Sequence, residues 1–143
     1  DLRGRGGSAD MAIRLMRLLR DYHEQTGKPV IALIDSMTRS AKEVIAHGIR
    51  HYEIGTLVGE RTAGAVLPAT FEKVGEETIL MYPTFRLSKY TDLIEGVGVE
   101  PDVKAAPPGM YSAGADPILD AALDEAVRHV RDQHVNRMVV PQP

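Results

Sequence analysis

A serine, Ser40, stands where a short apolar run over residues 30–34 gives way to a helical pattern that begins at Ala41. Negative charge that develops on a serine at a helix N-terminus lies near the positive end of the helix dipole, and the Ala41 N–H can point at a substrate oxyanion. Ser40 therefore suits a nucleophile of acyl transfer. Ser40 and Glu43 also form an S-x-x-E capping box, which explains both residues without any chemistry. On this segment alone, capping is the simpler interpretation.

The amino end of the chain is rich in glycine, because residues 1–7 read D-L-R-G-R-G-G. Glycine permits positive φ and close backbone approach, so the N–H groups of Gly6 and Gly7 can line an anion-binding concavity. This segment could supply one arm of an oxyanion hole. A tight turn between a strand and a helix explains the same glycines, and the motif by itself favours that turn.

Histidine and glutamate side chains share the second predicted helix. His47 and His51 are four residues apart, with Glu43 one turn earlier, which is a spacing that could bind a metal. We favour an exposed polar face of the helix instead, and we expect no metal and no organic cofactor. His47 follows Ser40 by seven residues, about 10 Å along a helix, which is too far for a general base.

The elements that must position these residues follow from hydrophobic periodicity. Apolar residues between Met11 and Tyr22 predict an amphipathic helix, capped at Ser8 or Asp10 and ended at Gly27. Residues 30–34 and 56–58 are short apolar runs typical of buried strands, and residues 41–52 between them predict a helix. This order predicts a βαβ unit with a right-handed crossover.

The second half of the chain has a different pattern. Residues 70–74 and 78–82 flank a Gly-Glu pair and predict a β-hairpin. We divide the chain into a core with the nucleophile over residues 1–104, a linker over 105–115 and a C-terminal helix over 116–135. We expect this helix to bury one apolar stripe, formed by Ile118, Leu119, Ala122, Leu123, Ala126, Val127 and Val130.

Composition limits the class of protein. The chain has 143 residues, of which 43% are hydrophobic and 26% charged, with a net charge of −3. This is the balance of a globular domain, and it shows neither a membrane-spanning segment nor the basic stripe of a nucleic-acid binder. Cysteine is absent, which excludes disulfides and thiolate metal sites. Because the chain starts at Asp1 without a leader, we expect it to be a fragment of a longer protein.

Four segments in the same order resemble the C-terminal processing, or tail-specific, serine peptidases and their tricorn-core relatives. Residues 1–7 are similar to the family's D-L-R-x-N-x-G-G loop, with Arg5 where asparagine is usual, and residues 38–43 to its T-A-S-A-S-E. Residues 57–64 resemble L-V-G-E-x-T-x-G, and residues 94–103 resemble I-E-G-x-G-x-x-P-D. The resemblance implies an α/β fold with a sheet of the ClpP and crotonase type flanked by helices. It also implies Ser40 as nucleophile, with an oxyanion hole from Ala41 and Gly6 or Gly7.

One departure from the family pattern concerns the general base. The processing branch has a lysine shortly after G-E-x-T. In this chain residues 63–66 read A-G-A-V and contain no lysine, so a Ser-Lys dyad at that position is excluded. Lys42 is a poor substitute, because residues two apart on a helix do not face each other. The tricorn-like branch uses an upstream histidine oriented by a glutamate that matches Glu95. We therefore expect the base before Asp1, although a solvated loop carboxylate also explains Glu95.

The resemblance thus implies a serine endopeptidase that cleaves polypeptides, near their C-termini or in unfolded chains. It favours an extracytoplasmic location and leaves homo-oligomers open. A catalytically silent binding or scaffold module with the peptidase fold is the main alternative, and the missing lysine together with Arg39 and Lys42 around Ser40 favours it. An acyl-CoA enzyme of the crotonase type is a third interpretation, which explains the Ser40 segment less well.

Overall fold

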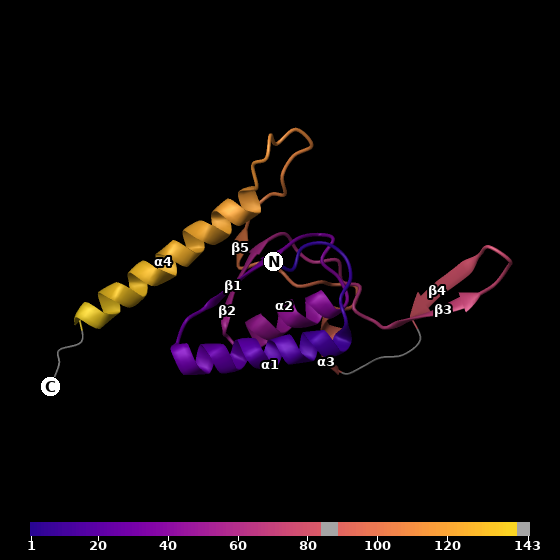
Figure 1. Ribbon diagram of the computed structural model, residues 1–143, viewed down its shortest axis with the longest axis horizontal. Helices are drawn as coiled ribbons and strands as arrows, with labels where there is room; N and C mark the ends of the chain where they lie inside the picture. Colours follow the sequence, from indigo (N-terminus) through magenta and orange to yellow (C-terminus); the bar gives the residue numbers. More distant parts are fainter. Residues whose placement is uncertain (84–88, 140–143) are drawn as a thin grey trace.

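The computed structural model describes residues 1–83 and 89–139 of the chain (Figure 1). Helices and strands alternate through the first half, as the periodicity predicts. The elements in chain order are α1 (Ala9–Thr26), β1 (Val30–Ile34), α2 (Ala41–His51), β2 (Gly55–Gly59), β3 (Ala69–Lys73), β4 (Ile79–Pro83), α3 (Lys89–Ile94), β5 (Val103–Lys104) and α4 (Pro117–Val139). Ser8 is the N-cap residue of α1, and Gly27 ends that helix with φ 64°.

The core is a parallel sheet with the strand order β1-β2-β5. β1 pairs with β2 over its whole length, from Val30 opposite Gly55 to Ile34 opposite Gly59, which confirms the predicted βαβ unit. β5 adds two residues, with Val103 opposite Val58. The sequence pattern missed β5, because two residues are too few to show a strand period.

Helices cover both faces of this sheet (Figure 1). Ala32 and Ile34 of β1 pack into the core under α1 and α2, whereas Leu33 packs into a second cluster with Ile118 and Ala122 of α4. Successive side chains of a strand point to opposite faces, so a strand with both faces covered reads as a continuous apolar run. The predicted α/β fold with a helix-flanked sheet is confirmed.

α4 departs from its prediction in length and in burial. It runs to Val139, beyond residue 135, and of the expected stripe only Ile118 and Ala122 are buried. The stripe is wrong at Leu119, Leu123, Val127 and Val130, which are between 41% and 68% exposed. The reason is that α4 packs on β1 and β2 through one edge, which carries Ile118 and Ala122, and nothing in the described part of the chain covers its other apolar residues.

The predicted hairpin is present as β3 and β4, which pair antiparallel with Phe71 opposite Met81. It projects away from the core (Figure 1), and its residues Phe71, Ile79 and Met81 are more than 60% exposed. α3, which the pattern did not predict, follows it and leads directly to Glu95. Among the described residues, no helix is both long enough and apolar enough to span a membrane.

Candidate active site

Ser40 lies at the corner between β1 and α2 in a backbone conformation that L-residues rarely adopt, with φ 58° and ψ −129°. Such a conformation costs about 1–3 kcal/mol, and it persists only where surrounding contacts impose it. Here the Ser40 N–H donates to the Ala65 carbonyl oxygen at 3.0 Å and to Oε2 of Glu43 at 3.1 Å. The Glu43 half of the predicted capping box is thus present, whereas the Ser40 side chain makes no cap hydrogen bond, and the loop that contains Ala65 helps to hold the corner.

Glu43 is the centre of these contacts and is fully buried. Its Oε1 accepts hydrogen bonds from Oγ1 of Thr62 and from the Gly64 N–H, both at 2.6 Å. Its Oε2 accepts one from the Ala65 N–H at 2.9 Å in addition to that from Ser40. The prediction that Glu43 belongs to an exposed polar face of α2 is therefore wrong. Helical periodicity could not show this, because most of the donors come from about twenty residues further along the chain.

The glycine loop, residues 1–7, is hydrogen-bonded to the strand and the helix that flank the Ser40 corner. The Leu2 N–H donates to the Leu33 carbonyl oxygen at 2.9 Å, and Nζ of Lys42 donates to the Arg3 carbonyl oxygen at 2.8 Å. Gly7 has φ 140°, and a Cβ there would lie 3.0 Å from Cβ of Ala41. The structure thus brings Gly7 against the first residue of α2.

Asp35 links the glycine loop to the turn before Ser40. Partial burial works to raise the pKa of its carboxyl, but hydrogen bonds from the Gly4 N–H, from Thr38 and from the Met37 N–H outweigh it and lower that pKa. The Gly4 bond is 3.0 Å long and the bond from Oγ1 of Thr38 is 2.8 Å. Asp35 therefore holds the loop as a carboxylate.

Glu95 lies directly after α3 and beside the same loop. Its Oε2 accepts hydrogen bonds from the N–H groups of Val66 and Leu67, at 2.8 and 3.0 Å. The preceding residue, Ala65, is the one whose carbonyl accepts the Ser40 N–H. Glu95 is therefore a partly buried carboxylate with defined partners, rather than a solvated one. Among the described residues, no donor is bonded to its Oε1.

The packing of two glycine-containing loops sets the position of Glu95. A Cβ at Gly98 would lie 2.4 Å from the Thr62 carbonyl oxygen, and one at Gly64 would lie 2.8 Å from the Gly98 nitrogen. Only glycine, at these positive φ angles of 76° and 67°, allows the two backbones to touch. The glycines of the two matched segments therefore serve contact between the Glu95 loop and the loop that binds Glu43.

Four of the five histidines have described side chains, and none is placed to serve Ser40. Nδ1 of His23 lies 2.9 Å from the Lys28 carbonyl oxygen, and Nε2 of His129 lies 3.3 Å from Oγ1 of Thr56. Both lie at the amino ends of the strands, whereas Ser40 follows the carboxyl end of β1. His47 stacks on His51, two turns along α2, and burial followed by the charges of His51 and Arg50 lowers its pKa.

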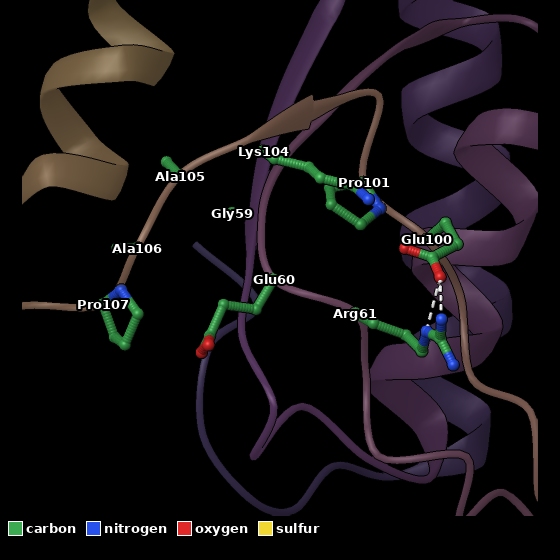
Figure 2. Close-up of a pocket in the computed structure, with 9 residues that line it drawn as sticks. All are labelled: Gly59, Glu60, Arg61, Glu100, Pro101, Lys104, Ala105, Ala106 and Pro107. Carbon is green, nitrogen blue, oxygen red and sulfur yellow. Dashed lines mark hydrogen bonds and ion pairs between the residues drawn. The ribbon is translucent and has the colours of Figure 1, made fainter.

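A cleft of about 460 Å³ lies at the carboxyl ends of β2 and β5 (Figure 2). Its lining carries both signs of charge, with the ion pair of Arg61 and Glu100 on one side and Lys104 and Glu60 also on its walls. The Ser36 N–H lies 3.4 Å from Oε2 of Glu60, so the cleft adjoins the turn that leads to Ser40. No cluster of side chains suited to holding a metal ion occurs among the side chains that the structure describes.

Comparison with known proteins agrees with this geometry. Over 109 residues the chain is 26% identical to the putative tricorn-like protease C-terminal subunit of Sulfurisphaera tokodaii, covering 73% of this chain and 13% of that protein. It is 31% identical over 102 residues to the tricorn protease of Thermoplasma volcanium, covering 67% and 10%. The crystal structure of the tricorn protease superposes with a TM-score of 0.58 at 25% identity, covering 72% of this chain and 10% of that one.

The chain therefore spans about a tenth of the length of these relatives. The model of the family described as Peptidase family S41 matches residues 2–105, which include the glycine loop, the Ser40 corner and the Glu95 loop. This chain belongs to peptidase family S41.

Proposed function

We propose that this chain carries part of the active site of a serine endopeptidase, with Ser40 as nucleophile. The observation that supports the proposal most strongly is the strained corner at Ser40, held by Glu43 and Ala65 and packed against the glycine loop. A capping serine needs no such conformation, since N-cap residues normally have β-region dihedrals. Strain of this kind is concentrated at functional sites.

In the proposed reaction, Oγ of Ser40 attacks the scissile carbonyl carbon and gives its proton to a general base. The N–H groups of Ala41 and of Gly6 or Gly7 stabilise the oxyanion, and collapse of the tetrahedral intermediate releases the amine with the proton from the base. Water then hydrolyses the acyl-enzyme. The substrate is a polypeptide, which in an unfolded segment or near its C-terminus can reach the corner in extended form.

The base is, in this proposal, a histidine from a segment outside this chain. Two features support it: Lys42 is bonded to the Arg3 carbonyl oxygen, and the four described histidines lie away from Ser40. Glu95 would orient that histidine through Oε1, while its Oε2 stays on the Val66 and Leu67 amides. A triad carboxylate acts in this way, by fixing the tautomer and stabilising the imidazolium.

The experiment is to assay the full-length protein and its Ser40→Ala and Glu95→Gln variants on one unfolded polypeptide. Ser40→Ala should abolish turnover, and Glu95→Gln should lower kcat by up to about ten-thousandfold with little change in KM. Circular dichroism melts control for folding. A full-length protein that binds the polypeptide but never cleaves it would instead establish the alternative, a silent scaffold. Unchanged kcat in Glu95→Gln would remove Glu95 from the site.

A further inference from the structure

Arg39, the residue immediately before Ser40, has a side-chain nitrogen that forms no hydrogen bond within the described part of the chain. It is half-buried, and its Nε is fully buried with no hydrogen-bond partner among the described residues. Two other arginines are, by contrast, ion-paired: Arg3 is bonded to Asp1 and Asp116, and Arg128 to Glu125. Buried polar groups are nearly always hydrogen-bonded, and a buried unsatisfied one calls for a physical explanation.

The carboxylates around the Ser40 corner accept hydrogen bonds from groups other than Arg39. These carboxylates are Asp35, Glu43, Glu60 and Glu95. No ion pair joins any of them to Arg39 in the part of the chain that the structure describes. Within the described residues the Arg39 guanidinium thus has no bonded acceptor, which leaves it available to a bound molecule.

The chemistry of that molecule follows from the group that would meet it. A guanidinium is a planar donor that is charged at every ordinary pH, and it binds carboxylates through two parallel N–H bonds. The first turn of α2, which starts two residues later, also favours negative charge. Both features select an anion beside Ser40, and an unfolded polypeptide carries anions only as carboxylates.

We propose that Arg39 binds a carboxylate of the polypeptide substrate next to the scissile bond and so determines the specificity of cleavage. This inference rests on the proposed function, because it takes Ser40 as the nucleophile. The carboxylate has two sources, an Asp or Glu side chain near the scissile bond or the free carboxyl terminus of the substrate. In this proposal the positive charge of Arg39 serves substrate recognition. In the sequence alone, Arg39 is one of the departures from the family pattern that favour a catalytically silent module.

The test uses the full-length protein and a matched series of peptides. The cleaved bond is first mapped by mass spectrometry, and the flanking residues are then varied between Glu and Gln, each with a free or an amidated C-terminus. The acidic form should be preferred in kcat/KM by about 10- to 100-fold, as expected for hydrogen bonds to a charged group. A preference for Glu identifies the side chain as the source, and a preference for the free terminus identifies the terminal carboxylate.

Arg39→Gln should bring this ratio close to one, and Arg39→Lys should retain part of it, because a lysine keeps the charge but loses the planar pair of donors. Arg131→Gln is the matched control. It removes the same charge from an exposed position on α4, whose neighbour Gln133 is bonded to Gly27, before the amino end of β1 and so at the opposite end of that strand from Ser40. A wild-type ratio near one, or a ratio that Arg39→Gln leaves unchanged, would overturn the inference.

A binding measurement separates this inference from the proposed function. Fluorescence anisotropy of the labelled acid and amide peptides is measured with Ser40→Ala and with Ser40→Ala/Arg39→Gln. Tighter binding of the acid peptide that disappears in the double variant supports the carboxylate site even if the wild-type protein hydrolyses nothing. Equal binding of both peptides to Ser40→Ala, together with cleavage that ignores carboxylates, would sink the inference and leave the peptidase proposal standing.

Discussion

Replacing Ser40 by glycine and by alanine separates backbone strain from hydroxyl chemistry. Both variants lose the hydroxyl, but only glycine adopts φ 58° and ψ −129° without steric cost. Relief of this strain is worth about 1–3 kcal/mol, and the extra freedom of glycine in the unfolded chain takes back about 0.4–1 kcal/mol. Ser40→Gly should therefore be more stable than Ser40→Ala by about 0.5–2 kcal/mol.

Urea unfolding followed by far-UV circular dichroism measures this difference. Ser36, which is exposed in the same turn and lacks a positive φ, is the matched control position. There the order should reverse, with the glycine variant less stable than the alanine variant by about 0.4–1 kcal/mol. If alanine equals or exceeds glycine at Ser40, the corner is not strained, and the main support for a nucleophile at this position is lost.

Four further predictions follow from the contacts of the corner. Glu43→Gln should lower the unfolding free energy by about 2–5 kcal/mol, because the NH2 of its amide group would face two buried N–H donors. The control Glu77→Gln, in the hairpin turn, should change the unfolding free energy by less than about 0.5 kcal/mol. Equal urea midpoints of the two variants would contradict this prediction. Gly7→Ala should lower kcat of the full-length protein by about 100-fold or more, since its Cβ would press on the first turn of α2 and move an oxyanion donor. An unchanged kcat would show that this part of the glycine loop does not stabilise the oxyanion. Because the pKa of Asp35 is lowered in the folded protein, its carboxylate stabilises the fold at pH values above the unfolded carboxyl pKa. This stabilisation is lost as the pH falls through the folded pKa. The difference in unfolding free energy between wild type and Asp35→Asn should therefore shrink from pH 7 to pH 3 in urea titrations. The 143-residue chain alone should keep its fold by circular dichroism and hydrolyse no peptide, because the described part offers no general base; robust hydrolysis would reveal one.

The elements with a regular period could be predicted from the sequence. β1 and α2 agree with their predictions to within a residue, because a run of five apolar residues and a helical stripe each report local geometry. α4 shows the limit of the same argument. Its apolar residues are spaced for burial, but which of them are buried depends on the width of the sheet beneath, and sequence period carries no information on that width.

The candidate site shows the same division. Ser40 at the start of a helix and the Glu43 cap follow from spacing, whereas the strained φ of Ser40 depends on a carbonyl twenty-five residues away. Glu95 was placed by the order of matched segments, and its amide partners could not be anticipated, since they depend on backbone contact between two glycine loops. Arg39 departs from the family pattern in the sequence, whereas the absence of a hydrogen-bond partner for its Nε among the described residues depends on packing that the sequence does not show.

Covalent trapping of the nucleophile tests directly whether Ser40 is an activated serine. The full-length protein is treated with a fluorophosphonate, which phosphonylates activated serines, and the modified peptide is identified by mass spectrometry. We expect one adduct of the expected mass on Ser40, absent from Ser40→Ala and suppressed by prior denaturation. An unmodified Ser40 in a folded full-length protein, or an adduct that persists in Ser40→Ala, would contradict it.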